Sequence, residues 1–238
     1  MTITNHRIDA HSNRTFGYDD LSTFLSMMTG DEKHSEAATS TLDVIWTLYD
    51  RVLKVDPSTV DDPDRDRFFL SKGHGPMAYY AVLAAKGFVD PAILPDFASS
   101  ESILGHHPDR RRIPGVEISS GSLGQGLALG IGASLGMDLS QFGGTVSVLM
   151  GDGELDEGSN HEAIALAGRM GMDRLTAIVI DNSSAYHGWP GGIESRFAVE
   201  GWETAVVDGR DHDAIFAGVT RPHPGAPLAV VARVERKN

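Results

Sequence analysis

Short, continuous apolar runs in the second half of the chain constrain its fold more than any other feature. The clearest are residues 145–150, 175–180 and 228–234, which have strand length and contain many β-branched side chains. Strands that are buried on both faces show this pattern, whereas strands of one-sided sheets alternate apolar and polar residues. Segments with helical spacing, 161–171 and 213–219, separate the runs. This order predicts an α/β domain with a mostly parallel sheet and helices on both faces.

The same patterns predict the remaining elements. Shorter apolar runs predict strands at 68–70 and 204–207, and helical spacing predicts helices at 21–28, 38–53 and 76–86. The polar segment 1–20 is expected to form an N-terminal arm. Residues 21–238 are expected to form one domain, for which the chain is long enough.

Composition excludes several classes of protein. The net charge of −13 argues against nucleic-acid binding, because phosphate backbones require Lys and Arg. No segment has the roughly 20 apolar residues of a membrane-spanning helix. The absence of cysteine and of a signal-peptide core permits a cytoplasmic location, which is the one we expect. The one basic run, Arg110–Arg112 beside Asp109, favours a solvated or interface loop, and a dedicated anion site is the alternative.

Polar residues follow two predicted strands at the points where those strands end. Gly151, Asp152 and Gly153 follow one run, and Asn182 follows the next. Ligands of parallel α/β sheets bind beyond the carboxyl ends of the strands, so Asp152 and Asn182 face one crevice if their strands are neighbours. A carboxylate oxygen and an amide oxygen suit Mg²⁺ or Ca²⁺, and the same metal ion would also coordinate the oxygens of a diphosphate. The alternative for the Gly-Asp-Gly tripeptide alone is a tight turn.

A glycine-rich segment provides a second candidate for phosphate binding. Residues 119–126 read SSGSLGQG and lead into a segment of small residues, 127–136, with helical character. Backbone amides at a helix N-terminus can hold an anion, which is the functional interpretation. The alternative is a loop that leads into a tightly packed helix.

A series of motifs follows in one order along the chain. They are DRDRFFLSKGH at 64–74, GHHP at 105–108, PGVE at 114–117, GSLGQG at 121–126, GDGELDEG at 151–158, Glu162-Ala163, Asp181-Asn182 and Gly188. The series resembles the N-terminal, thiamine-diphosphate-binding section of transketolase, from about Gly30 to Val234. The resemblance implies the thiamine-diphosphate-binding fold, in the form of its diphosphate-binding domain.

The resemblance implies thiamine diphosphate and a divalent metal as cofactors. The metal would be Mg²⁺, or Ca²⁺ or Mn²⁺ in its place, and its ligands would be Asp152, the Asn182 side chain and the Ser184 carbonyl. The residues that would lie against the diphosphate are His74, Gly121 and Gly153.

Other matched positions concern the cofactor's rings and a subunit interface. Leu123 and Tyr186 would pack near the rings, although an aliphatic residue is usual at the position of Tyr186. Glu157 and Glu162 would belong to a carboxylate network that crosses the interface. The alternatives are a core aromatic for Tyr186 and an ordinary charged helix start for the two glutamates.

Three histidines match active-site histidines of the family: His34, His74 and His107. Histidine suits a site that handles sugar hydroxyls, because it donates, accepts and carries protons near neutral pH. The segment after His34 departs from the family pattern, and His106 is an additional neighbour of His107. A further family histidine has no counterpart, and His187 is a candidate replacement.

The resemblance also implies a partner. Single-chain transketolases continue through a pyrimidine-binding domain, whereas this sequence ends soon after its last predicted strand, at Asn238. We therefore expect a C-terminal transketolase-like subunit to supply that domain, with two such pairs forming an α2β2 heterotetramer.

The implied activity is the transfer of a two-carbon ketol unit from a ketose donor to an aldehyde acceptor. One alternative is a split acyloin-forming carboligase of specialised metabolism. The altered loop after His34, the doubled His106–His107 and Tyr186–His187 would fit such a change of substrate. A second alternative is a non-catalytic scaffold subunit, against which the retained metal-site residues argue.

Overall fold

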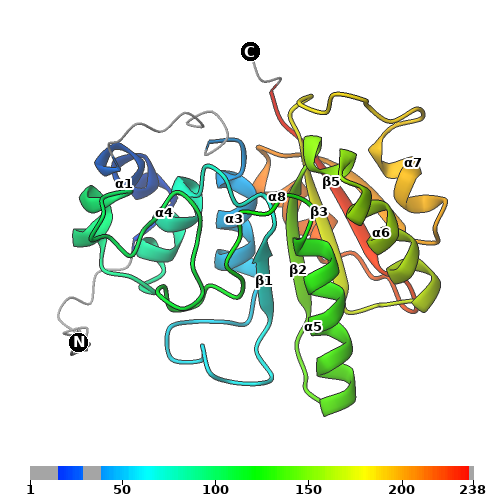
Figure 1. Ribbon diagram of the computed structural model, residues 1–238, viewed down its shortest axis with the longest axis horizontal. Coiled ribbons are helices and arrows are strands. Elements are labelled where there is room, and N and C mark those ends of the chain that lie inside the picture. Colours follow the sequence, from blue (N-terminus) through cyan, green and yellow to red (C-terminus); the bar gives the residue numbers. More distant parts are fainter. Residues whose placement is uncertain (1–15, 29–38, 236–238) are drawn as a thin grey trace.

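A five-stranded parallel sheet in the order β1-β2-β3-β5-β4 forms the centre of the computed structural model (Figure 1). The structure describes residues 16–28 and 39–235. The strands are β1 Arg67–Leu70, β2 Val146–Gly151, β3 Leu175–Asp181, β4 Glu203–Asp208 and β5 Leu228–Arg233. The predicted α/β fold is confirmed, and every predicted strand lies within one residue of its observed bounds.

Helices cover both faces of the sheet (Figure 1). One side carries α3 Leu42–Thr47, α4 Met77–Ala85 and α8 His212–Val219, with α1 Leu21–Met27 packed on α4. The other side carries α5 Gly126–Ser140, α6 Gly158–Met170 and α7 Ile193–Ala198. The helix predicted at 38–53 is observed as two consecutive elements, α3 and a π-type turn, η2 Leu48–Val52. The α-helical part is therefore shorter than predicted.

The alternation of side chains along the strands explains why the apolar runs are continuous. Leu149 and Ile178 point into the core beneath α3 and α4. Their neighbours Val148 and Val179 point into the core beneath α5 and α6. Because both faces are covered, every position of β2 is buried and hydrophobic burial stabilises both layers.

Some elements were not predicted. These are α7 and three short 3₁₀ turns, η1 Tyr18–Asp20, η3 Pro91–Asp96 and η4 Gly153–Asp156. A long irregular segment, 97–125, connects η3 to α5 across the carboxyl edge of the sheet and carries several predicted site residues. Among the described residues, no helix is long and apolar enough to cross a membrane.

The described part of the predicted N-terminal arm contacts the domain. The Tyr18 hydroxyl donates a 2.5 Å hydrogen bond to the Asp43 carboxylate of α3. The ring of Phe16 packs edge-on against Phe24, with 5.0 Å between ring centroids. Residues 1–15 and the candidate His34 lie outside the described residues.

Candidate active site

Asp152 and Asn182 lie at the carboxyl ends of the neighbouring strands β2 and β3. Both are buried, with 1% and 6% of their surface exposed. The loop that follows β3 folds over Asp152: the amides of Ser184 and Ala185 donate to carboxylate Oδ2 at 2.6 and 3.1 Å. The Ser184 hydroxyl and the Gly153 amide donate to Oδ1. The sheet therefore brings the three predicted metal ligands to one edge.

The Asn182 side chain has an unusual environment. Its amide oxygen Oδ1 is buried and has no hydrogen-bond partner among the described residues. A buried polar atom without a partner is costly, and such atoms in native structures call for an explanation. A hard cation is a suitable partner for this oxygen, beside the Asp152 carboxylate.

The Ser184 carbonyl completes a possible donor set. A methyl group on Gly153 would lie 3.4 Å from this carbonyl oxygen, so the loops after β2 and β3 are in contact here. The described residues contain no group of three His, Cys, Asp or Glu side chains that could hold a metal. A cation at this edge would therefore depend on amide and carbonyl oxygens beside one carboxylate. That chemistry suits Mg²⁺ or Ca²⁺, and the residues present fit it.

A buried carboxylate, Glu154, connects the parts of the site. Its Oε1 accepts hydrogen bonds from the Ser71 hydroxyl, at the end of β1, and from the Gly124 amide at 3.0 Å. Its Oε2 accepts from the Gly151 amide at 3.3 Å. Only 3% of Glu154 is exposed, and burial raises the pKa of this carboxyl above its usual value. Glu154 therefore holds two strand ends and the glycine-rich loop together.

Glu154 is a site residue that the sequence motifs did not identify as one. The available signal was its position three residues after the strand end, within the GDGELDEG motif. A sequence pattern shows that the carboxylate is present, but it does not show that the Gly124 amide and the Ser71 hydroxyl converge on it.

The glycine-rich loop leads directly into α5. The Ser71 hydroxyl accepts a 3.0 Å hydrogen bond from the Gly126 amide, the first residue of α5. A side chain at Gly126 would collide with Ser71, so this contact requires glycine. The Ser159 hydroxyl of α6 donates to the Gly124 carbonyl at 2.8 Å. The loop is thus fixed against β1 and α6.

His74, Gly121 and His107 come from separate loops that meet. A methyl group on Gly73 would collide with Ser120, which places the loop of His74 against the glycine-rich loop. Gly121 has φ +148°, and a methyl group there would lie 3.6 Å from the His107 ring. The Ser120 hydroxyl beside them is buried and has no partner among the described residues.

The structure distinguishes the two adjacent histidines. His107 is the one that lies against Gly121. The ring of His106 instead packs edge-on against Phe97, with centroids 5.9 Å apart. Both side chains are exposed, and His74 is half-buried. His107 is therefore the histidine that adjoins the predicted cofactor loop.

The remaining predicted residues lie on the surface of this chain. They are Leu123, Glu157, Glu162, Tyr186 and His187. Leu123 is 39% exposed and Tyr186 is 91% exposed. The Asp156 carboxylate fixes the loop of Tyr186 and His187, because it accepts hydrogen bonds from their amides at 3.0 and 3.4 Å. The sequence motifs did not identify this role of Asp156. In this chain Tyr186 is not a core aromatic.

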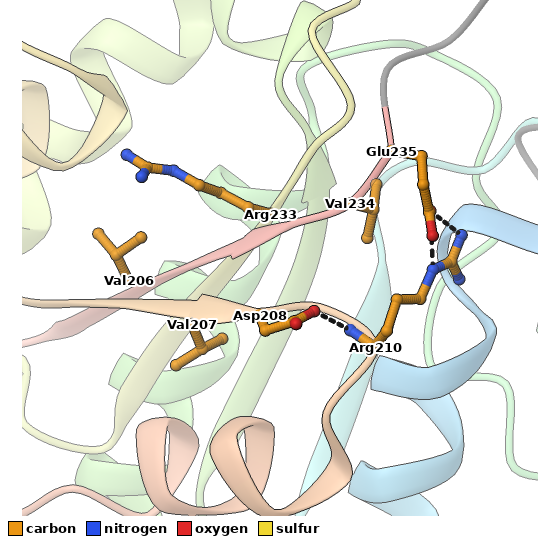
Figure 2. Close-up of a pocket in the computed structure, with 7 residues that line it drawn as sticks. All are labelled: Val206, Val207, Asp208, Arg210, Arg233, Val234 and Glu235. Carbon is orange, nitrogen blue, oxygen red and sulfur yellow. Dashed lines mark hydrogen bonds and ion pairs between the residues drawn. The ribbon is translucent and has the colours of Figure 1, made fainter.

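A cavity of about 680 Å³ lies elsewhere, at the carboxyl ends of β4 and β5 (Figure 2). Its lining includes Val206, Asp208 and Arg233. Figure 2 shows Arg210 and Glu235 paired at one end, 2.7 Å apart, with Arg233 pointing away from them. Strand β3 separates this cavity from the end of β2, so it is not the crevice of Asp152.

Comparison with known proteins identifies the family. The model of the transketolase thiamine-diphosphate-binding domain matches residues 24–225. The chain is 55% identical over 224 residues to a Rhodococcoides fascians protein named ferredoxin fas2, covering 94% of this chain and 74% of the relative. It is 35% identical to a 6-deoxy-6-sulfo-D-fructose transketolase subunit of a Clostridium species, covering 78% of this chain and 70% of the relative.

The solved structures agree with this assignment. A transketolase from Pichia stipitis superposes with a TM-score of 0.78 at 25% identity, covering 91% of this chain and 36% of that one. Fold, motif order and sequence similarity therefore converge, and the chain belongs to the transketolase family as its thiamine-diphosphate-binding domain.

Proposed function

We propose that the chain is the N-terminal subunit of a split transketolase that transfers a two-carbon ketol unit from a ketose to an aldehyde. The observation that carries the proposal is the buried Asn182 Oδ1 beside Asp152, which has no hydrogen-bond partner within residues 16–28 and 39–235. Family membership alone would also fit a scaffold that had lost its cofactor. A scaffold would have no need to keep a costly unpaired oxygen at the metal position.

The residues that would hold the cofactor are those already gathered at the sheet edge. Asp152, Asn182 and the Ser184 carbonyl would bind Mg²⁺, or Ca²⁺ or Mn²⁺, and the metal would neutralise the diphosphate in an acidic protein. His74 and Gly121 would lie against the diphosphate. When bound, thiamine diphosphate supplies the electron sink for cleaving and forming the carbon–carbon bond.

The protein's own groups would position the sugar and move protons. His107 adjoins Gly121 and is exposed, so its ring can reach a substrate hydroxyl. His74 enters from the loop after β1. Imidazole can donate or accept a hydrogen bond and can exchange a proton near neutral pH. These two histidines, with His34, are the proposed substrate-side groups.

The exposed apolar residues support a partner subunit. The side chains of Leu123 and Tyr186 are large and exposed, and both are predicted to pack near the rings of the cofactor. Exposed apolar groups beside a binding site favour coverage by ligand or protein. The similarity to a protein named as a transketolase subunit supports a partner subunit. In the proposed assembly, that partner is a C-terminal subunit that carries the pyrimidine-binding domain, and two such pairs form an α2β2 heterotetramer.

The name of the ferredoxin relative does not transfer to these 238 residues. Iron–sulfur clusters of ferredoxins are held by cysteine thiolates, and this sequence contains no cysteine. The shared region is instead the one that matches the transketolase domain.

A split acyloin-forming carboligase is the second candidate. It is favoured by the exposed Tyr186–His187 pair, whose rings meet edge-on at 5.0 Å at a position where the family usually has an aliphatic residue. A panel of ketose donors and pyruvate distinguishes the two activities, because a ketose supplies a dihydroxyethyl unit for ketol transfer, whereas decarboxylation of pyruvate supplies the hydroxyethyl unit of an acyloin-forming enzyme.

Calorimetric titration of thiamine diphosphate with Mg²⁺ tests the proposal directly. The chain is titrated alone and after co-expression with a candidate C-terminal transketolase-like subunit. We expect binding that tightens strongly with the partner and is lost in Asp152→Ala. Asp61→Ala, which removes an exposed carboxylate on a distant loop, is the matched control. Equal binding by Asp152→Ala and the native chain would refute the assigned site.

A further inference from the structure

Backbone amides of the loop after β3 converge on two carboxylates. Four consecutive residues, 184–187, donate their amides to the side chains of Asp152 and Asp156. The first two amides share Oδ2 of Asp152, and the next two share Oδ2 of Asp156. These carboxylates stand at the two ends of the short turn η4. One turn therefore holds one loop through two separate anchors.

Ser183 gives the loop its direction. Its φ of +58° lies in the left-handed region, which serine rarely adopts and which costs conformational energy. Successive amides next to a left-handed residue form a concave surface that binds anions, and here carboxylates of the protein occupy it. Such a conformation persists only where the surroundings hold the chain in place. The hydrogen bonds to Asp152 and Asp156 provide that support.

The two carboxylates differ in what else they are expected to do. Asp152 is a predicted metal ligand, so a cation would share its charge and displace one of its hydrogen-bond donors. Asp156 is not a predicted ligand, and it is half-buried at the far end of η4. Its carboxylate therefore stays available to the loop whether or not a cation is bound.

Asp156 also holds the part of the loop that lies farthest from the end of β3. In the described part of the chain, the Tyr186 and His187 amides donate to Asp156 alone, at 3.0 and 3.4 Å. The next anchor is Trp189, whose ring packs against His161 of α6 with centroids 5.2 Å apart. Removal of the Asp156 carboxylate would thus leave both amides without a hydrogen bond to the protein.

We propose that Asp156 is a positioning residue for the cofactor site. It keeps the loop after β3 in place while Asp152 binds the cation, so that the Ser184 carbonyl remains a metal ligand and Tyr186 remains at the predicted rings. Carboxylates bind backbone amides strongly, and contacts of this outer kind orient the groups that touch a metal. This role rests on the proposed function, because it concerns the cofactor of the same site.

Two substitutions separate position from charge. Asp156→Ala removes both acceptor contacts, whereas Asp156→Asn removes the charge but keeps an oxygen that can accept from the same amides. Asp61→Ala, at an exposed position on a distant loop, is the control.

Three measurements are made on each variant. NMR measures the hydrogen exchange of the Tyr186 and His187 amides in the chain without cofactor, which requires no activity. Calorimetry on the partner complex measures the affinity for thiamine diphosphate with Mg²⁺. Urea denaturation of the isolated chain shows whether the variant is folded.

We expect both amides to exchange about tenfold faster or more in Asp156→Ala, and the affinity for thiamine diphosphate to fall about tenfold or more. Asp156→Asn should keep both quantities within about threefold of the native values, because its oxygen retains the hydrogen bonds. The urea midpoints of all variants should stay close to that of the native chain, since the contacts lie in a surface loop.

The outcomes distinguish this role from the proposed function. Native affinity in Asp156→Ala, in a complex that binds the cofactor, would overturn the positioning role alone. Equal losses of affinity in Asp156→Ala and Asp156→Asn, with the two amides still protected in Asp156→Asn, would overturn it as well, because the charge and not the hydrogen bonds would then be required. Absence of binding by the native complex would overturn the proposed function and this role with it.

Discussion

The Ser184 amide donates a 2.6 Å hydrogen bond to Asp152 Oδ2, and this contact joins the ends of β2 and β3. Both carboxylate oxygens of Asp152 accept hydrogen bonds from the protein. A bound cation would displace at least one of these hydrogen-bond donors, and the Ser184 hydroxyl is the donor that can rotate away. The same carboxylate thus holds the loop after β3 and faces the proposed metal.

Asp152→Asn tests whether that carboxylate is used for its charge. The amide has nearly the same shape, but its NH₂ group would face backbone donors and it carries no charge to attract a cation. We expect the Mg²⁺-dependent affinity for thiamine diphosphate to fall at least about 100-fold. Calorimetry on the partner complex measures it, with Asp61→Asn as the control. Native affinity in Asp152→Asn would mean that the metal binds elsewhere.

Gly126→Ala tests the contact that fixes the start of α5. The new methyl group would collide with Ser71, so we expect a loss of about 1–3 kcal/mol in the free energy of unfolding. Gly132→Ala, in the same helix, is the matched control because nothing lies within 4 Å of its added methyl group. That substitution should stabilise the chain by up to about 1 kcal/mol. Urea denaturation of both variants decides between packing and helix propensity, since propensity alone would stabilise both.

Glu154→Gln tests the buried carboxylate through pH. Burial raises the pKa of Glu154, so the folded state holds its proton more tightly than the unfolded state does. Its contribution to stability is therefore fully present below the unfolded pKa and is lost as pH rises through the folded pKa. Glutamine does not titrate, so the stability of the native chain relative to Glu154→Gln should decline as the pH rises above about 4.5, the usual pKa of this carboxyl.

Glutamine also replaces one acceptor oxygen with a donor that faces a backbone amide. We therefore expect Glu154→Gln to be less stable than the native chain at pH 4 by about 1–2 kcal/mol. Urea midpoints across the pH range measure both effects, and Glu101→Gln, at an exposed position, is the control. A pH-independent difference would show that burial does not shift the titration of Glu154.

The sequence predicted those parts of the fold in which a single local constraint, such as burial on both faces of the sheet, determines the residue type. Continuous apolar runs predicted the five strands because both faces of the sheet are covered. Helix α7 was missed because its six residues follow Gly191 and Gly192 and are too few for a periodic pattern. The turn η3 was missed because it contains Pro95.

The candidate site shows the same division. Motif order identified Asp152 and Asn182, and the sheet places them on neighbouring strands. The connecting role of Glu154 depends on the Gly124 amide, which belongs to a loop 30 residues away in sequence, and no local pattern encodes this contact. The distinction between His106 and His107 likewise depends on which ring meets Gly121. Long-range contacts of this kind appear only when the fold is known.

Tyr186→Ala tests whether the exposed aromatic serves the complex rather than the fold. Because Tyr186 is 91% exposed, its removal should change the stability of the isolated chain by less than about 0.5 kcal/mol. If the ring packs on the cofactor in the assembled enzyme, the affinity for thiamine diphosphate should fall about tenfold or more. Calorimetry on the complex and thermal denaturation of the isolated chain measure the two effects.

Tyr186→Leu is the conservative variant to compare with Tyr186→Ala, because leucine keeps an apolar side chain at the position where the family usually has an aliphatic residue. It should retain most of the affinity that alanine loses. Leu139→Ala, at an 87% exposed position near the end of α5, should alter neither measurement. Unchanged cofactor affinity in Tyr186→Ala would remove Tyr186 from the binding site and leave its exposure to be explained by the partner surface alone.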